Sequence, residues 1–357
     1  MKIVIAAGGS GGHVFPAIYT AKQLKARGHD VVFLTTQGLP ERLVLKNDFK
    51  AHVLCAKGMS LSSPAFFIKS VLAMIKAIGQ ASRLIKEISP DVVAGFGGYV
   101  AFPAVIVSYF QNRPVILHEQ NVVPGRANRW ASKFVKNIAA SFPQTKKYFS
   151  NKKITMTGCP CREPLDENNN EGMYQELGLL ASRPTILVLG GSQGSQKINE
   201  EFSRAVDLLQ GGFDFQLIHL CGEKDYGAVK GRYQDIKQPY CVLPFLDEID
   251  KAYQLADLVI CRAGAVTIFE LMRFCKKAIV VPYPFAGAHQ KENANILVEV
   301  GLAKIIEDQD LSASRLKNEI QKMIVQEINK KEVLQRIKPY SFPNASQLLA
   351  DVIEGAA

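Results

Sequence analysis

A glycine-rich turn near the N-terminus is the first place in the sequence where chemistry could occur. Residues 6–17 read AAGGSGGHVFPA and follow the strand-like run KIVI at residues 2–5. A turn of this kind between a strand and a helix presents backbone N–H groups at the helix N-terminus, where anions bind. We therefore expect the turn to bind a phosphate group. The alternative is a tight turn that only packs the helix on the strand.

His13 follows this turn directly. Imidazole titrates near neutral pH, so a neutral His13 could take a proton from an attacking hydroxyl group, or it could bind substrate or hydrogen-bond the loop. His118 and Glu119 end another strand-like run, where α/β sheets place their sites. Glu119 could orient His13, act as the base itself, or pair with Arg126 or Arg129.

The second half of the chain contains two further turns of this type. GGSQGS at residues 190–195 follows a strand-like run, and Ser192 and Gln193 stand there at a predicted helix start that suits a diphosphate. RAGAVTIFE at residues 262–270 is another such turn before a helix. Glu270 could accept hydrogen bonds from two neighbouring ribose hydroxyls, or it could serve the helix dipole as a first-turn acidic residue.

The glycine turns do not match the two commonest nucleotide-binding loops. A Walker loop ends in Gly-Lys-Ser/Thr, which neither glycine turn contains. A dinucleotide site needs G-x-G-x-x-G and an acidic residue at the end of the second strand. Here residues 9–14 read GSGGHV and residues 35–37 read TTQ. We therefore do not expect NAD, and a sugar nucleotide or a lipid diphosphate held between two domains remains.

Short β-branched runs alternate with amphipathic stretches along the whole chain, which is typical of parallel βαβ units in a doubly wound α/β sheet. A strand followed by a glycine turn occurs twice, so the 357 residues indicate two Rossmann-like halves. The segment TGCPCREPLDENNNEG at residues 157–172 is rich in Pro, Asn and Gly, and we expect a hinge there. The seven cysteines show no zinc spacing, which favours reduced thiols in a cytoplasmic protein.

Positive charge is concentrated in the first half of the chain. The net charge is +10, yet residues 1–150 hold 19 Lys and Arg against 6 Asp and Glu. Such asymmetry indicates a nucleic acid or a membrane surface as partner, or simply a solvated basic face. We expect no signal peptide, because the first apolar run is short and a glycine turn follows it.

The most apolar stretch, residues 63–88, is interrupted by lysine and arginine residues and does not read as a membrane span. On a helix, Phe67, Val71, Ile75 and Ile78 form one apolar stripe, which we expect to pack on the sheet. Phe66 and Phe67 are placed at the helix start, where exposure would let them contact a membrane. The basic first half would add attraction to anionic lipids.

Six motifs occur in a fixed order: GGSGGHVFPA, GFGGYVAFPAV, HEQNVVPGRANR, GGSQGS, CRAGAVTIFEL and HQKENA. In this order they resemble the MurG family of glycosyltransferases over nearly the whole chain. The resemblance implies the GT-B fold, with two Rossmann-like doubly wound parallel-sheet domains facing a cleft. The implied domains are residues 1–160, to which the helix at 343–357 returns, and residues 161–342. The first would face the acceptor and the membrane, and the second would bind UDP-GlcNAc.

The resemblance also implies an activity. The family transfers N-acetylglucosamine with inversion from UDP-GlcNAc to undecaprenyl-diphosphate-MurNAc-pentapeptide, at the cytoplasmic face of the membrane. No cofactor or metal is implied, since the fold needs none and no Asp-x-Asp motif occurs. The implied partners are the two substrates and an anionic membrane surface, without nucleic acid, and the oligomeric state is left open.

The family's site residues map onto matching positions of this chain. His13 and Glu119 match catalytic positions, Asn121 and Gln290 would contact the donor, and Leu246 would meet the uracil through its backbone. Arg162 would balance the charge of two phosphates. The substrate-binding positions implied by the resemblance are Ser10, Gly11, Gly12, Asn121, Arg162, Ser192, Leu246, Ala265, Val266, Thr267, Ile268, Phe269, Glu270 and Gln290.

The chain departs from the family pattern at two places. Residues 158–162 read GCPCR where Gly-Asn-Pro-Val-Arg is common, and residues 58–67 read GMSLSSPAFF where a basic loop is common. Three alternative functions remain: a GT-B transferase with another lipid or natural-product acceptor, a non-catalytic membrane-docked scaffold, and a nucleic-acid binder indicated by charge alone. Release of UDP with the lipid acceptor would exclude the scaffold, and salt-dependent oligonucleotide binding would indicate the third.

Overall fold

The computed structural model describes residues 1–56, 58, 64–166, 170–284 and 289–357, with the backbone alone for residues 64–67. The chain divides into two compact units. The N-terminal unit comprises Met1–Cys161 and Tyr340–Ala357, and the C-terminal unit comprises Arg162–Pro339.

The N-terminal unit is built on a seven-stranded sheet of order β3-β2-β1-β4-β5-β6-β7, in which every neighbouring pair is parallel. Its central strands are nearly continuous runs of buried apolar residues, as expected of a parallel sheet covered on both faces. The strand order reverses direction between β1 and β4, and ligands of open α/β sheets bind at the carboxyl ends beside such a point. The strands are β1 (Lys2–Ala7), β2 (Asp30–Thr35), β3 (Lys50–Val53), β4 (Val92–Gly97), β5 (Val115–Glu119), β6 (Asn137–Ala140) and β7 (Lys153–Met156).

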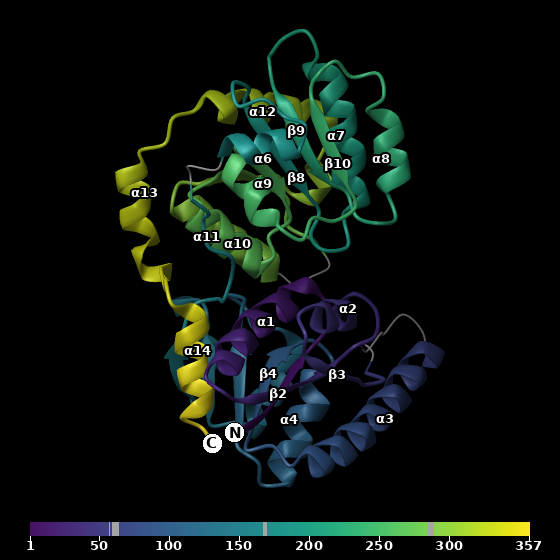
Figure 1. Cartoon of the computed structure of the whole chain (residues 1–357), viewed down its shortest axis with the longest axis vertical. Coiled ribbons are helices and arrows are strands. Elements are labelled where there is room, and N and C mark those ends of the chain that lie inside the picture. The colour runs from purple at the N-terminus through teal and green to yellow at the C-terminus, as the bar shows by residue number, and fades with distance from the viewer. Residues whose placement is uncertain (57, 59–63, 167–169, 285–288) are drawn as a thin grey trace. The chain divides into compact units, whose positions relative to one another are not determined.

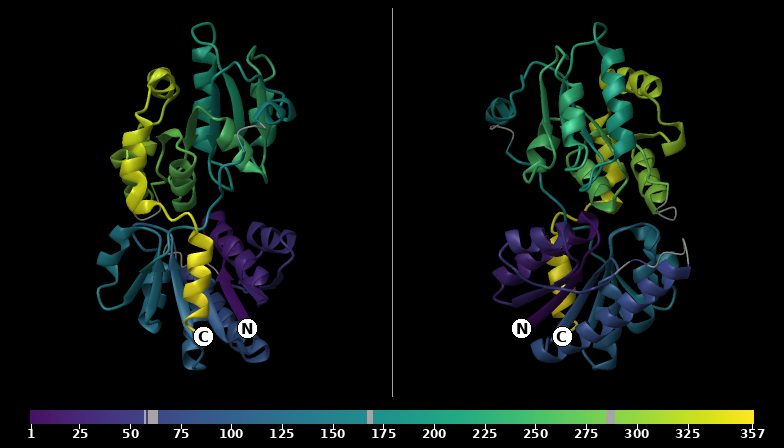
Figure 2. Two further views of the ribbon diagram at one scale, coloured as in Figure 1. Left: turned by 60° about the vertical axis from the view of Figure 1, so that its left-hand side comes forward. Right: turned by 90° about the vertical axis from the view of Figure 1, so that its right-hand side faces the viewer.

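Helices cover this sheet, and the last helix of the chain is one of them (Figures 1 and 2). Helix α14, drawn in yellow, contacts α1, drawn in purple, and buries Leu349 and Ile353. Glu354 of α14 accepts hydrogen bonds from Arg27 and His29 at the end of α1. The helices of the unit are α1 (Gly11–Ala26), α2 (Leu39–Lys46), α3 (Pro64–Ile88), α4 (Ala101–Phe110), α5 (Arg126–Ala131), α14 (Ala345–Glu354) and the 3-10 turns η1 (Ser132–Phe134) and η2 (Pro143–Tyr148).

Helix α3 packs through only part of the apolar stripe that its sequence predicts: Ile78 packs against the core and Val71 is half-buried. Ile75 is 60% exposed, and the buried face carries Ala77, Ala81 and Ile85, which join the core beside α4. Leu84 and Ile88 also pack against this core, so the packed face combines small and large apolar side chains. The expected packing of Ile75 is therefore wrong. The side chains of Phe66 and Phe67 lie outside the described ones.

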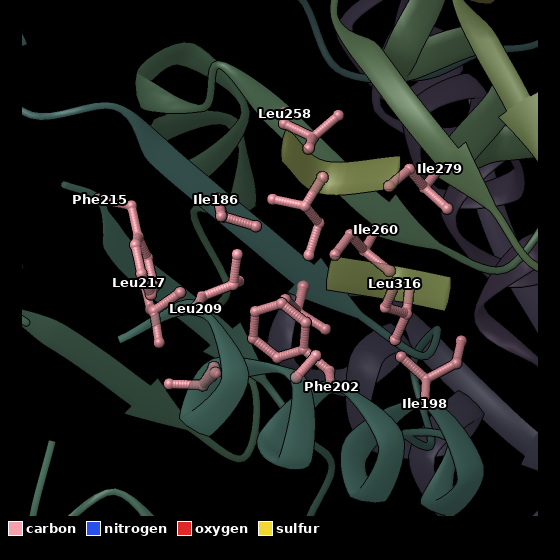
Figure 3. Packing of buried hydrophobic residues seen from close by; sticks show 14 of the residues in the cluster. Ile186, Ile198, Phe202, Leu209, Phe215, Leu217, Leu258, Ile260, Ile279 and Leu316 are labelled. Carbon is pink, nitrogen blue, oxygen red and sulfur yellow. The ribbon is translucent and has the colours of Figure 1, made fainter. Parts of the chain in front are cut away.

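The C-terminal unit repeats the design with a six-stranded sheet of order β10-β9-β8-β11-β12-β13, again entirely parallel. Figure 3 shows its core, where Phe202 and Ile198 of α7 lie over Ile186 and Ile260 of neighbouring strands. The predicted α/β class with two parallel-sheet domains is confirmed. The strands are β8 (Thr185–Leu189), β9 (Gln216–Leu220), β10 (Tyr240–Leu243), β11 (Leu258–Cys261), β12 (Lys277–Val280) and β13 (Ala303–Ile305).

The helices of the C-terminal unit flank its sheet (Figure 2). They are α6 (Asn170–Glu176), α7 (Gln196–Leu209), α8 (Tyr226–Arg232), α9 (Ile249–Leu255), α10 (Ala265–Arg273), α11 (His289–Glu299), α12 (Ala313–Val325), α13 (Lys330–Ile337) and the 3-10 turn η4 (Asp308–Asp310), with η5 (Lys338–Tyr340) at the return to the N-terminal unit. In the part of the chain that the structure describes, no helix combines the length and apolar content needed to cross a bilayer.

Candidate active site

The first glycine turn joins β1 to α1 at the carboxyl edge of the N-terminal sheet. Ser10 caps the helix with an extended backbone, and its carbonyl oxygen accepts the N–H groups of His13 and Val14 at 3.2 and 3.3 Å. Gly11 and Gly12 therefore form the start of the first turn, where N–H groups point along the helix axis away from the helix. Ser10, Gly11 and Gly12 thus lie together in the geometry that suits an anion.

A second glycine segment, after β4, lies against this turn. A Cβ atom at Gly98 would lie 2.1 Å from the carbonyl oxygen of Gly8, and Gly98 has a φ of +74°. At Gly97 (φ +103°) a Cβ atom would lie 2.8 Å from Nδ1 of His13. Only glycine fits such close approaches, so the motif GFGGYV is required for the turn and the His13 ring to pack as they do.

His13 belongs to a chain of hydrogen-bonded side chains. Its Nδ1 lies 3.1 Å from Oε1 of Gln120. Nε2 of Gln120 donates to the carbonyl oxygen of Phe96 at 2.8 Å and lies 3.0 Å from Nδ1 of His118. Nε2 of His118 in turn lies 3.2 Å from the carbonyl oxygen of Gly158. These hydrogen-bonded side chains link the first helix turn to the ends of β4 and β5 and to the segment after β7.

His118 is completely buried at the end of β5. Burial lowers its pKa to about 4, with the hydrogen bond to Gly158 acting in the opposite direction. The imidazole is therefore neutral near pH 7, and it serves as a hydrogen-bonding link. Ser141 completes its surroundings, with its hydroxyl 3.2 Å from Nε2 of His118 and 3.1 Å from the carbonyl oxygen of Gly158.

Glu119 is buried and its carboxylate accepts four hydrogen bonds. Oε1 accepts from the backbone N–H and the side-chain amide of Asn121, and Oε2 accepts from the N–H of Gly125 and the amide of Asn128. Glu119 therefore organises the loop between β5 and α5. Among the described residues Gln120, and not Glu119, contacts His13, and neither predicted arginine supplies a bond to Glu119.

The same bonds hold Asn121, the residue that the family resemblance assigns to the donor. Its side-chain amide donates to Glu119, and its carbonyl oxygen accepts from the hydroxyl of Thr145. Asn121 is half-buried at the carboxyl edge of the sheet. The bonds to Glu119 and Thr145 fix its position there.

The second glycine turn, residues 190–195, joins β8 to α7 in the C-terminal unit. Helix α7 begins at Gln196 with Ser195 as its cap, so Ser192 lies in the turn before the cap rather than at the helix start. A Cβ atom at Gly194 would lie 2.2 Å from the carbonyl oxygen of Cys221. Glycine is needed there because the turn lies directly on the segment after β9.

Arg262 supports this turn from the end of β11. Its Nη2 lies 2.8 Å from the hydroxyl of Ser195, and its Nη1 lies 2.6 Å from a carboxylate oxygen of Asp308. Its guanidinium also lies over the ring of Tyr283, 5.5 Å from the ring centre. Arg262 thus connects the turn to β11 and η4, and both terminal nitrogens of its guanidinium have partners.

Arg162 and Glu270 form an ion pair in the C-terminal unit. Nη1 of Arg162 lies 3.2 Å from Oε1 of Glu270, and its Nη2 donates to the carbonyl oxygen of Asp247 at 3.0 Å. Glu270 is 3% exposed, and burial raises its pKa while Arg162 opposes that change. The charge of Arg162 is shared with this carboxylate, and its role in balancing two phosphates stays a prediction.

Glu270 lies in the second turn of α10, so it is not a first-turn residue serving the helix dipole. Gly264 precedes the helix with an extended backbone, and Ala265, Val266 and Thr267 form the first turn. The side chains of Ile268 and Phe269 are buried in the core. Of these positions, the first turn offers backbone N–H groups and Glu270 offers a carboxylate.

Gln290 and Leu246 lie at the same edge of the C-terminal sheet. Oε1 of Gln290 accepts from the N–H groups of Ala263 and Tyr283 at 3.2 and 2.9 Å, so its amide NH₂ is the group that could serve a sugar hydroxyl. Leu246 is half-buried in the loop between β10 and α9, next to Asp247, whose carbonyl oxygen Arg162 contacts.

Three residues of the site were missed by sequence analysis. Gln120 follows the two residues singled out in HEQN, and Arg262 stands at the start of the motif that contains Glu270. Asp308 carries no local signal, because its contact with Arg262 joins segments 46 positions apart. Among the described residues, no group of three His, Cys, Asp or Glu is placed to hold a metal ion.

Comparisons with known proteins address the family directly. Residues 3–140 match the glycosyltransferase family 28 N-terminal domain, and residues 185–349 match the family 28 C-terminal domain. The UDP-N-acetylglucosamine--N-acetylmuramyl-(pentapeptide) pyrophosphoryl-undecaprenol N-acetylglucosamine transferase of Thermodesulfovibrio yellowstonii is 35% identical, with 99% of this chain and 98% of that protein aligned. The chain belongs to the MurG family.

Further matches agree with the family assignment. The transferase of the same name from Halothermothrix orenii is 34% identical over 100% of this chain and 99% of its own length. The crystal structure of Acinetobacter baumannii MurG is 30% identical, with a TM-score of 0.73 and 99% of both chains covered. Both halves of this MurG-family chain, including the His13 turn and the α10 turn, therefore lie within the aligned regions.

Proposed function

We propose that this MurG-family chain is an inverting N-acetylglucosaminyltransferase that uses UDP-GlcNAc as donor and undecaprenyl-diphosphate-MurNAc-pentapeptide as acceptor. The observation that carries the proposal is the full-length similarity to transferases named for these two substrates. The glycine turns before α1 and α7, at the carboxyl edges of the two sheets, support it, because both substrates contain a diphosphate.

The reaction replaces the bond from the anomeric carbon to the diphosphate by a bond to the acceptor oxygen, and one proton moves from the acceptor hydroxyl to a base. A hydroxyl oxygen of the muramyl sugar attacks the anomeric carbon of GlcNAc, and the bond from that carbon to the diphosphate oxygen breaks with its electron pair leaving on UDP. The hydroxyl proton passes to a base, for which we propose the Nε2 atom of His13. A general base of this kind contributes typically 10²–10⁴-fold to the rate.

The C-terminal unit is proposed to bind the donor. The backbone N–H groups of residues 190–195 and of the first turn of α10 would stabilise the negative charge that develops on the leaving diphosphate. Glu270 would accept the ribose hydroxyls, with Arg162 holding its carboxylate in place. The amide NH₂ of Gln290 would donate to a hydroxyl oxygen of the sugar.

The N-terminal unit is proposed to bind the acceptor. The turn at Ser10, Gly11 and Gly12 would hold an anionic group of the lipid diphosphate, next to His13 on the same helix turn. Glu119 would act indirectly, since its carboxylate already accepts four bonds from the loop that contains Asn121. We therefore assign the base to His13 and a supporting position to Glu119.

The polyprenyl tail of the acceptor lies in a bilayer, so we also propose that the N-terminal unit docks on an anionic membrane surface. Ile68, Leu72 and Ile75 of α3 are 57%, 60% and 60% exposed and recur at helical spacing. Lys69 and Lys76 lie exposed beside them. An exposed apolar stripe with a basic flank is typical of a helix that lies in a membrane interface. The cytoplasmic face of the membrane is the location this proposal implies.

The decisive experiment measures UDP release with the lipid-linked muramyl-pentapeptide, comparing UDP-GlcNAc with UDP-GalNAc and UDP-glucose. We expect turnover that requires the acceptor and prefers UDP-GlcNAc. His13→Ala should lower kcat by about a hundredfold or more and change the KM for UDP-GlcNAc little. A chain that binds UDP-GlcNAc but releases no UDP with any acceptor would instead be a non-catalytic scaffold.

A further inference from the structure

We propose that Gln120 is a positioning residue that fixes the tautomer of His13, with the proton on Nδ1 and the lone pair on Nε2. The inference rests on the proposed function, in which Nε2 of His13 takes the proton of the acceptor hydroxyl. It is carried by the hydrogen-bonded chain of side chains beneath the first helix turn.

The orientation of the Gln120 amide is set by a group that can only accept. Its Nε2 lies 2.8 Å from the carbonyl oxygen of Phe96, so this end of the amide must be the NH₂ group. The reversed amide would bring two oxygen atoms to that distance without a hydrogen between them. The acceptor Oε1 is therefore the end that faces His13, independently of any assumption about the histidine.

The neighbour on the other side agrees with this orientation. Nε2 of His118 lies 3.2 Å from the carbonyl oxygen of Gly158, another group that can only accept, so this nitrogen carries the proton of the neutral ring. Nδ1 of His118 then has a lone pair and can accept the second N–H of Gln120 at 3.0 Å. Both amide hydrogens of Gln120 have acceptors.

The orientation of the Gln120 amide determines which nitrogen of His13 carries the proton. Oε1 of Gln120 lies 3.1 Å from Nδ1 of His13 and needs a donor, so Nδ1 carries the proton. A neutral imidazole has one N–H, which leaves the lone pair on Nε2. Gly97 holds the ring in this position, since its missing Cβ leaves the space that Nδ1 occupies. His13 is thus prepared as a base at Nε2 before any substrate binds.

The tautomer can be measured directly by nitrogen chemical shifts of the full-length chain labelled with ¹⁵N-histidine, at about pH 8 where imidazoles are neutral. The chain has six histidines, and the spectrum of His13→Gln identifies the signals of His13. We expect the Nδ1-protonated form for His13 in the wild type. An Nε2-protonated His13 in the wild type would overturn the inference, whether or not the chain proves to be a transferase.

Variants of Gln120 test whether its side-chain oxygen fixes the tautomer of His13. Gln120→Met keeps the length of the side chain but removes the acceptor, so we expect a mixture of tautomers, a kcat at least tenfold lower and a KM for UDP-GlcNAc within about twofold. Gln120→Glu keeps an oxygen facing His13, while its second oxygen replaces the NH₂ group and must carry a proton to donate to the carbonyl oxygen of Phe96. In this protonated form the variant should retain the Nδ1-protonated form of His13 and more turnover than Gln120→Met.

Ser108→Ala is the matched control, because it removes a buried hydroxyl of the same unit that donates to the carbonyl oxygen of Ala104 within α4, outside the network of His13. We expect its His13 signals and kcat to stay as in the wild type. An unchanged His13 tautomer in Gln120→Met would overturn the inference, as would an equal loss of kcat in Ser108→Ala. If Gln120→Met fails to fold, the wild type and Gln120→Glu still decide through their His13 signals. Altered tautomers without any transferase activity would refute the proposed function alone.

Discussion

The carboxylate of Glu270 is buried beside the guanidinium of Arg162, and its proposed partners are the two ribose hydroxyls of the donor. Glu270→Ala removes both acceptor oxygens, whereas Glu270→Gln keeps one. A hydrogen bond lost at a buried site costs about 1–3 kcal/mol, so UDP affinity should fall about 10- to 100-fold for the alanine variant and less for the glutamine variant. Isothermal titration of UDP into the wild type and each variant measures these affinities.

Glu163 provides the matched control for Glu270. It pairs with Arg273 in the same unit but is largely exposed, with 57% of its side chain accessible. Glu163→Ala should leave UDP affinity as in the wild type. Unchanged affinity in Glu270→Ala would remove Glu270 from the donor site.

Helix α3 has one face buried in the core and one face exposed to solvent. The face with Ala77, Ala81 and Ile85 packs beside α4, and the stripe of Ile68, Leu72 and Ile75 is exposed. If this stripe enters a membrane interface, Leu72→Ser combined with Ile75→Ser should reduce sedimentation with anionic-lipid vesicles while leaving UDP affinity intact. High salt should release the wild type, because each lysine near the surface contributes about 1 kcal/mol of attraction.

The control for this prediction uses exposed apolar residues of the C-terminal unit. Leu208→Ser combined with Val325→Ser makes the same chemical change at positions that are 46% and 75% exposed. This variant should sediment like the wild type. Equal binding by the α3 variant and the wild type would place the membrane-facing surface on another element.

The whole molecule carries one deeply buried histidine in the sheet of each unit. Burial lowers the pKa of His118 to about 4 and that of His219 to about 3. In the unfolded chain both take up protons as the pH falls below about 6.5, whereas in the folded chain they do not until much lower pH. The free energy of unfolding should therefore fall as the pH falls from about 6.5 to about 4, by up to about 1.4 kcal/mol per pH unit for each histidine.

Urea unfolding at about pH 7.5, 6 and 5 measures this dependence before most carboxylates titrate. His219→Gln removes one of the two titrating groups while keeping a donor and an acceptor for Asn199 and Tyr233. It should show a shallower dependence than the wild type. A midpoint that is constant from pH 7.5 to 5 would contradict the assignment of both histidines as neutral in the folded state.

The sequence by itself determined the fold class and the positions of the phosphate-type turns. Apolar runs such as residues 185–189 were recognisable as buried strands, and the glycine turns after them follow from local backbone chemistry. The order of the six motifs was enough to indicate the family. These features are local or linear along the chain, so no knowledge of distant contacts is needed to find them.

The tertiary structure alone decided which side chains meet. Gln120 contacts His13 across 107 positions, and Arg162 contacts Glu270 across 108, so neither spacing carries a local signal. The packed face of α3 was also a tertiary outcome, since Ala77, Ala81 and Ile85 are buried beside α4 whereas Leu72 and Ile75 are exposed. Periodicity shows that a helix has an apolar stripe, but the shape of the surface it meets selects the face that is buried.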